Sequence, residues 1–412
     1  MNDKVLNYNF NILLSGVFVK ALGSGMYSIG AMMLVLFISG NPFYSGVAFF
    51  VVGLPSCISF LIAPFANYVS YKKALVLCEL TKSILLLSIP LLYTFSMLHV
   101  WTVIMIMFVV ALISTFTYPI ETTLVPTFVG KENVVKANSY INMLRESLDV
   151  VFLAAAGIII AMIGSVTAIL ITAGCHLITT VLYLFFRLEV VKHKETFRLK
   201  QTLHNYRHDL KEGLIYIRPT ILPHIIAAAV LLNFFTGSMF ASIPAFSLMQ
   251  GGNEAYYGYY LVAMTLGLLI GSFLTPRIKH LPYSKLTMGA ALLSGVFWIG
   301  SSMLPVWYSL TFYCIGFIGV GVINILIISI VQQQVEEKMI GRVITILVSL
   351  SAIGQPLGAL VGGAVSSAAS PVYPIMMAGM MMVVFSMYFL VHPLLRSLES
   401  IDKLSVFKQT AK

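Results

Sequence analysis

A succession of long apolar runs constrains this chain more than any other feature. About twelve runs of roughly 20 residues or more occur, the length that a helix needs to cross a hydrocarbon core of about 30 Å. They cover residues 10–38, 45–69, 74–95, 100–128, 138–162, 165–187, 222–248, 255–276, 285–304, 308–333, 342–367 and 373–395. Only 10% of the residues are charged, whereas a soluble domain carries about 25%. The sequence therefore predicts an all-α membrane protein with twelve transmembrane helices.

Lysine and arginine are distributed unevenly among the polar connections. If the N-terminus is placed inside the cell, alternate loops and both tails collect these residues, for example Lys72, Lys73 and Arg277. The outer loops carry no Lys or Arg near Asn41, Ser96, Gly164, Gly251, Pro305 and Ser370. This bias predicts a multi-pass protein of the cell membrane with both termini in the cytoplasm. It also accounts for the net charge of +10 without a nucleic-acid partner.

Other classes of protein find little support. The four cysteines, Cys57, Cys78, Cys175 and Cys314, are scattered in apolar runs without metal-ligand spacing, which favours small core residues. No nucleophile elbow or phosphate-binding loop is found, so we expect neither an enzyme nor a cofactor or metal site. The first apolar run is too long for a signal peptide and lacks a small-residue cleavage site, so it is interpreted as a span.

A polar stretch at 188–221 divides the apolar runs into six and six. We expect an N-terminal bundle at 1–190, a cytoplasmic linker at 191–221, and a C-terminal bundle with a cytoplasmic tail at 222–412. Apolar residues recur within the linker at helical spacing, which predicts an amphipathic helix at the inner surface. They are Leu203, Tyr206, Leu210, Leu214 and Ile217.

The two halves resemble each other in their cytoplasmic turns. "APFANYVSYKKALVL" (63–77) resembles "GSFLTPRIKHLPYSKL" (271–286), and "FVGKENVVKANSYINML" (128–144) resembles "QQVEEKMIGRVITIL" (333–347). Both pairs are separated by about half of the chain. Two six-helix halves related by an axis along the membrane normal are typical of one large group of secondary transporters.

Three further segments resemble the major facilitator superfamily. Within it they resemble the drug:proton antiporter branch, which includes macrolide-efflux-type and siderophore-export-type carriers. They are "YPIETTLVPTFVGKENVVKANSY" (118–140), "DLKEGLIYIR" (209–218) and "GRVITILVSLSAIGQPLGALVGG" (341–363). The resemblance implies a monomeric carrier that exports a small lipophilic or amphipathic, drug- or macrolide-like compound by alternating access and proton antiport. Export of a siderophore-like or lipid-like metabolite and proton-coupled uptake by symport are the alternatives.

The chain also departs from the family pattern. The second-to-third loop has Asn67 and Tyr68 where an Asp-Arg pair is usual, and Lys72 and Lys73 are what remains of its basic end. The Gly-Pro-rich antiporter motif of the fifth span is replaced by "FLAAAGIII" (152–160). Antiport is therefore implied by the branch resemblance and not by this motif.

Ionisable residues well inside the spans are confined to the first half. They are Lys20, Glu79, Lys82, Glu121, Arg145, Glu146 and Asp149. A charge inside a membrane is costly and marks a functional site by default. Glu79 and Lys82 are three residues apart and are expected to pair on one helix. At ~1.5 Å per residue, Glu121 and Arg145 lie at similar depths, as do Lys20 and Asp149, so each of these two pairs is plausible.

These pairings leave Glu146 without an obvious cation. A buried carboxyl without a cation favours its protonated form, and Glu146 and Asp149 are close enough on a helix to share a proton. Glu146, Asp149 and Glu121 are therefore the candidates for proton coupling, with Lys20 and Arg145 as their charge partners. The structural alternative is an ion network that holds the helix ends together.

The substrate cavity is expected near the middle of the membrane, between the halves. Polar and aromatic residues of the first, fourth, seventh and tenth spans are its candidates: Tyr27, Tyr118, Asn233, Phe234 and Asn324. In the eleventh span, Gly354, Gly358 and Gly362 form a flat helix face, and Pro356 favours a bend in the same helix. Close helix packing and a surface that slides during transport are both consistent with this face.

Overall fold

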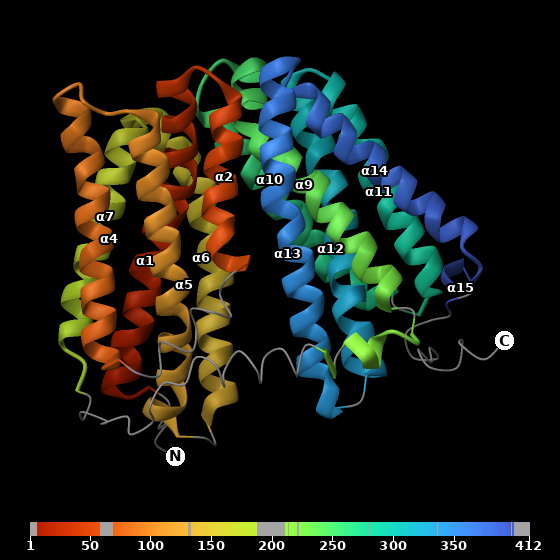
Figure 1. Ribbon diagram of the computed structural model, residues 1–412, viewed down its shortest axis with the longest axis horizontal. Coiled ribbons are helices and arrows are strands. Elements are labelled where there is room, and N and C mark those ends of the chain that lie inside the picture. Colours follow the sequence, from red (N-terminus) through yellow and green to blue (C-terminus); the bar gives the residue numbers. More distant parts are fainter. Residues whose placement is uncertain are drawn as a thin grey trace. The chain divides into compact units, whose positions relative to one another are not determined.

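The computed structural model describes residues 6–57, 69–130, 133–187, 211–212, 214–220, 222–278, 280–335, 337–396 and 398, and all regular structure in these ranges is helical (Figure 1). The helices are α1 (Tyr8–Ser39), α2 (Pro42–Cys57), α4 (Tyr71–Thr94), α5 (Val100–Val129), α6 (Val134–Ile163), α7 (Ser165–Leu184), α9 (Leu222–Gly251), α10 (Ala255–Ile278), α11 (Tyr283–Met303), α12 (Val306–Gln334), α13 (Glu337–Ala368), α14 (Val372–Val391) and α15 (Pro393–Arg396). An apolar chain in a membrane forms helices because each then satisfies its own backbone hydrogen bonds.

Nine of the described helices are long and apolar enough to cross a membrane, and α2 is a shorter apolar helix. Most helix ends lie within a few residues of the predicted spans. The exceptions are α14, which ends four residues before the predicted end at 395, and α6 and α13, which begin four and five residues before the predicted starts at 138 and 342. The polar residues that precede these two spans continue the helix, because helical hydrogen bonding does not end where apolar composition ends.

Several predictions fall on residues outside the described ranges. They include Asn67 and Tyr68, the last part of the predicted span 45–69, and most of the predicted linker helix. Residues 211–212 and 214–217 at the end of this linker are helical.

The helix boundaries follow local chemistry. At the start of α1, the side chain of Asn7 accepts a hydrogen bond from the amide of Phe10 at 3.0 Å, which satisfies one of the free amides of the first turn. At its end, Gly40 adopts φ +62° and its amide donates to the carbonyl oxygen of Leu36 at 2.8 Å. The left-handed conformation is accessible to glycine without steric cost, so the chain turns there.

The chain divides into two compact units. Unit 1 comprises Met1–Gly40, Val51–Leu199 and Asn253–Gly258, and unit 2 comprises Asn41–Phe50, Lys200–Gly252 and Tyr259–Lys412. Each unit thus takes a short segment from the part of the sequence that mainly forms the other.

Unit 1 is built around α1, which packs against α5, α6 and α7, while α4 packs against α5 and α7. Its core near the N-terminal end of α1 joins side chains from all five helices. The fully buried members include Phe10, Leu75, Ile120, Leu124 and Tyr183. Tyr183 stacks on Phe186 with ring centroids 4.9 Å apart, and Gly16 lies against the Tyr183 ring, where a side chain on α1 would clash. Close helix contact thus brings α7 against α1.

Unit 2 depends on the contact between α9 and α13. A methyl group on Gly354, Gly358 or Gly362 would overlap the backbone of α9 at Val230, Phe234 or Ser238. These three glycines therefore allow close approach of α13 to α9. Hydroxyl groups reinforce it: Ser366 Oγ donates to Ser242 Oγ at 2.7 Å.

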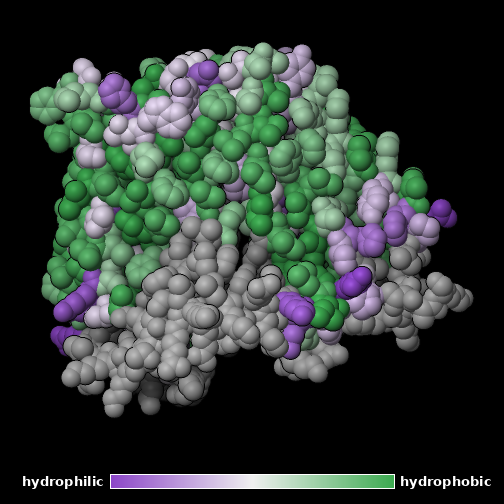
Figure 2. All heavy atoms as spheres, viewed as in Figure 1, coloured by the Kyte–Doolittle hydropathy of each residue, from purple (hydrophilic) through white to green (hydrophobic). Residues whose placement is uncertain are grey.

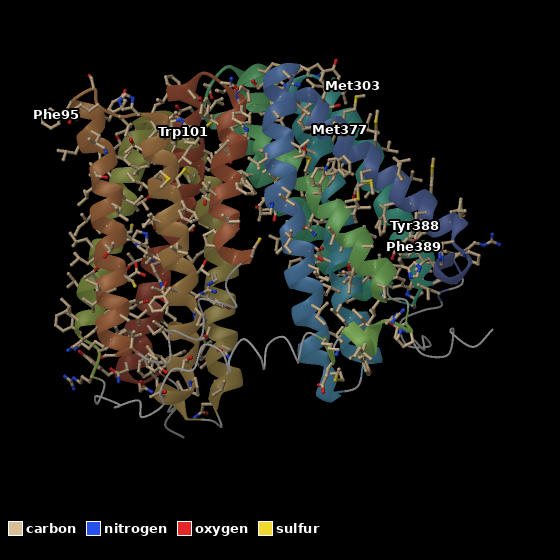
Figure 3. The ribbon with its side chains drawn as sticks, viewed as in Figure 1. Phe95, Trp101, Met303, Met377, Tyr388 and Phe389 are labelled. Atoms are coloured by element: carbon tan, nitrogen blue, oxygen red, sulfur yellow. The ribbon has the colours of Figure 1, made fainter. Side chains whose placement is uncertain are left out.

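The exterior is apolar, as expected for side chains that face lipid. Figure 2 shows green, hydrophobic residues over the middle of the visible helices and purple residues mainly near the helix ends. In Figure 3, Phe95 and Trp101 lie where α4 ends and α5 begins, and 69% and 54% of their surfaces are exposed. Exposed aromatic residues at helix ends are typical of the interface between lipid and water.

We expect Gly358→Ala to lower the thermal midpoint of the full-length protein in detergent micelles, because the added methyl group forces α13 away from Phe234. Gly289→Ala on α11 is the matched control, since a methyl group at Gly289 meets no atom within 4 Å. Replacing a helical glycine by alanine otherwise stabilises a helix by about 1 kcal/mol. Equal midpoints for the two variants would contradict the proposed role of this contact.

Candidate functional site

The described part of unit 1 contains a cavity of about 250 Å³ between α1, α5 and α6. Its apolar wall is formed by four buried residues, Leu13, Val17, Val125 and Ile141. Its polar wall is formed by Tyr118, Glu121, Thr122, Asn138 and Arg145. A concave site with apolar walls and a few convergent polar groups is the usual form of a small-molecule site.

Glu121 is the acidic residue of this cavity, and it is 7% exposed. Its Oε1 atom forms an ion pair with Nζ of Lys20 on α1. The hydroxyl of Tyr183 on α7 donates to the same oxygen at 3.0 Å. Lys20 also lies 5.6 Å from the centroid of the Tyr183 ring. Three helices therefore converge on one carboxylate oxygen, and both described contacts leave Oε2 for a proton or a ligand.

Arg145 is the basic residue that lines the cavity, and it is half-buried on α6. Its guanidinium carbon lies 5.4 Å from the centroid of the Tyr118 ring on α5. Such a cation–π contact contributes about 0.5–2 kcal/mol, depending on how far the pair is removed from water. The contact places the guanidinium group beside the cavity.

A second polar cluster joins α4 to α7 deeper in unit 1. The carboxylate of Glu79 is fully buried and contacts two bases, Lys82 Nζ to Oε1 at 2.7 Å and His176 Nδ1 to Oε2 at 2.6 Å. The ion pair predicted between Glu79 and Lys82 is thereby confirmed. Both oxygens are occupied and Lys82 is 2% exposed, so the cluster is a packed link between helices.

The expected partner of Glu121 is corrected. The structure pairs Glu121 with Lys20, where the sequence suggested Arg145. The expected contact between Lys20 and Asp149 falls on a side chain outside the described residues. Depth along the helices was a poor guide because a lysine side chain spans several ångströms, which lets Lys20 reach a carboxylate at a different level. The side chains of Glu146 and Asp149 lie outside the described residues.

The predicted cavity residues are placed in different parts of the fold. Tyr118 lines the unit 1 cavity. The hydroxyl of Tyr27 is buried elsewhere on α1 and has no hydrogen-bond partner in the described part of the chain. In unit 2, the side-chain amide of Asn233 donates to the carbonyl oxygen of Ala229 on its own helix at 2.9 Å. The backbone of Phe234 lies against Gly358, and Asn324 is exposed on α12.

Sequence reasoning missed Tyr183 and Asn138 as members of the site. Tyr183 carries a detectable signal, because a tyrosine inside an apolar span requires a partner for its hydroxyl group. Asn138 lies where the polar start of α6 meets the predicted span, and nothing in the sequence around it indicates that it lines a cavity.

One residue that remains from the family pattern has a structural role. Lys72, which remains from the basic end of the second-to-third loop, donates from Nζ to the carbonyl oxygen of Phe186 at 2.8 Å. Phe186 lies just after the end of α7, where unpaired carbonyl groups favour a cation. Lys72 therefore ties the start of α4 to the end of α7.

The sequence pattern of the Major Facilitator Superfamily matches residues 13–359. Two uncharacterized transporters of this type from Bacillus subtilis strain 168 are similar along most of their length. YvqJ is 22% identical over 376 residues, 89% of this chain and 88% of the relative. YkuC is 26% identical over 360 residues, 83% of this chain and 81% of the relative.

Solved transporter structures share the fold. The nucleoside transporter NupG covers 97% of this chain with all of its own length, at a TM-score of 0.71 and 13% identity. A bacterial homolog of the human lysosomal transporter Spinster, in an inward-facing and unoccupied conformation, covers 95% of this chain and 96% of its own length, at a TM-score of 0.65 and 13% identity. At such low identity the likeness concerns the fold alone.

Reversal of the ion pair at the cavity tests its contribution. We expect Lys20→Glu and Glu121→Lys each to reduce the yield of folded protein, because each places two like charges together in an apolar bundle. The double variant Lys20→Glu/Glu121→Lys restores opposite charges and should recover most of that yield, as measured by size-exclusion chromatography. A double variant no better than either single variant would refute the pairing.

The buried cluster on α4 allows a second test. Lys82→Met leaves the Glu79 carboxylate buried without its lysine, and breaking a buried pair in this way costs about 3–5 kcal/mol. We expect a large fall in the thermal midpoint for Lys82→Met and a smaller one for Glu79→Gln/Lys82→Met. Lys73→Met is the matched control, since Lys73 is exposed on the same helix. A double variant less stable than Lys82→Met would contradict this account.

Proposed function

The chain belongs to the Major Facilitator Superfamily and is a membrane transporter, and we propose that it exports a small amphipathic or lipophilic compound by proton antiport. The carrier would use alternating access, with a proton moving inward as the compound moves outward. Drug- or macrolide-like compounds are the first class to be tested, and siderophore-like or lipid-like metabolites are the second.

The position of Glu121 is the observation that carries this proposal. Its carboxylate is buried, lines the cavity and is held on one oxygen by Lys20 and Tyr183. Protonation of Glu121 would abolish its attraction for Lys20, because only the ionised carboxylate balances the ammonium group. Protonation would therefore release Lys20 and favour a different arrangement of α1 and α5, so that carriers with and without the proton would differ in the helices that line the cavity, as coupled exchange requires.

Glu146 and Asp149 remain candidates for proton coupling on sequence grounds. They follow Arg145 on α6, the helix that supplies one wall of the cavity. Their contribution is a separate proposal that rests on their position in the helix, and it is tested with their own variants.

The proposed architecture has twelve transmembrane helices in two pseudo-symmetric halves, at 1–190 and 222–412, joined by a cytoplasmic linker at 191–221. The absence of Lys and Arg from alternate loops supports cytoplasmic termini. A monomer is proposed as the working unit. The glycine face of α13 with Pro356 is proposed to permit small shifts against α9 during the transport cycle.

We expect Glu121→Gln to remove the response of transport to a pH gradient, because the amide cannot bind and release a proton. Transport is measured in proteoliposomes with a pH gradient imposed in either direction, over a panel of lipophilic and amphipathic compounds. The variant should still exchange substrate across the membrane without a gradient. Glu212→Gln, in the segment before α9, is the matched control and should respond like the unmodified protein.

The same measurement distinguishes the alternatives. Movement of substrate in the direction opposite to proton flow supports antiport. Movement of substrate in the same direction as proton flow would establish uptake by symport in place of export. Glu146→Gln and Asp149→Asn are measured in parallel. Antiport through these carboxyl groups would be excluded if all three variants kept the full response to pH.

A further inference from the structure

We infer that the unit 1 cavity selects a compact anionic head group, so that the substrate is an amphipathic organic acid whose carboxylate binds Arg145. This inference deepens the proposed function, since it names the substrate class for the same cavity. The argument rests on charge, on geometry and on the volume of the site.

Charge is the first element. Among the described residues that line the cavity, Glu121 and Arg145 are the two that carry a full charge at neutral pH. Lys20 is paired with Glu121 from the adjacent helix, so the acidic charge is already balanced within the protein. Arg145 is contacted instead by an aromatic ring, which stabilises a cation without neutralising it. Within the described part of the chain Arg145 has no carboxylate partner, so an anion is the ligand that complements its charge.

Geometry is the second element. A guanidinium group presents its N–H donors in a planar fork that matches a carboxylate, and the two groups form paired hydrogen bonds. The ring of Tyr118, 5.4 Å from the guanidinium carbon, restricts the orientation of Arg145 before a ligand arrives. The side-chain amide of Asn138 offers further N–H donors on the same wall.

Volume is the third element. The cavity measures about 250 Å³, below the roughly 300–1,000 Å³ of sites that enclose a drug-sized ligand. It therefore suits the polar end of a substrate and a short apolar segment beside Leu13, Val17, Val125 and Ile141.

The test compares three small aromatic probes that differ in the charge of one group: benzoate, benzylamine and benzyl alcohol. Each is titrated against the full-length protein in lipid nanodiscs at pH 7 and constant ionic strength, by isothermal titration calorimetry. We expect benzoate to bind at least about tenfold more tightly than the other two, since hydrogen bonds to charged groups contribute about 1.5–3 kcal/mol.

The variant Arg145→Gln should lose this preference, and Arg145→Lys should keep a part of it, because lysine retains the charge but lacks the fork. Arg277→Gln is the matched control: Arg277 is exposed on α10 in unit 2, and the substitution should leave benzoate binding unchanged. Circular dichroism and the thermal midpoint of each variant establish that it is folded. Retention of the benzoate preference in folded Arg145→Gln, or a preference for benzylamine, would overturn the inference.

Failure of this inference is distinguishable from failure of the proposed function. Transport of neutral or cationic compounds driven by a pH gradient, together with no preference for benzoate, would leave proton antiport intact and reject the anionic substrate. Binding of benzoate that depends on Arg145, without any response of transport to pH, would retain the anion site and reject antiport. Phenyl phosphate is added as a fourth probe, and binding tighter than that of benzoate would assign the site to phosphate head groups in place of carboxylates.

Discussion

The ion pair between Lys20 and Glu121 is the interaction on which the organisation of unit 1 depends. It joins α1 to α5 inside an apolar bundle, and Tyr183 extends it to α7. A charge in such surroundings persists only with a partner, because the loss of hydration is otherwise uncompensated. The pair therefore links α1 to α5, two of the three helices that form the cavity, and it also creates the site where a proton would alter that arrangement.

The two units solve the problem of helix association in different ways. Unit 1 uses ionic and hydrogen-bonded links, including the buried cluster of Glu79, Lys82 and His176 between α4 and α7. Unit 2 uses close backbone contact, in which glycines on α13 meet the main chain of α9. Close packing of small residues needs no titratable group, whereas the links in unit 1 are made by titratable side chains.

The sequence predicted those structural features whose residues all lie within one helix. The long apolar helices, the Glu79–Lys82 pair and the glycine face of α13 each depend on residues within one segment. The partner of Glu121 was predicted incorrectly because it depends on how two helices rotate and how far the long side chain of Lys20 reaches. The roles of Tyr183 and Asn138 were missed for the same reason, since each becomes meaningful only beside residues far away in the chain.

The sequence by itself determined that this protein is a helical membrane protein of the Major Facilitator Superfamily, since apolar run length and local motifs are properties of contiguous residues. It also determined that intramembrane charge is confined to one half. Only the tertiary structure decided which charges meet and which one is left facing a cavity. The reason is physical: the energy of a buried charge depends on the atoms within a few ångströms, and helices that are distant in sequence supply those atoms.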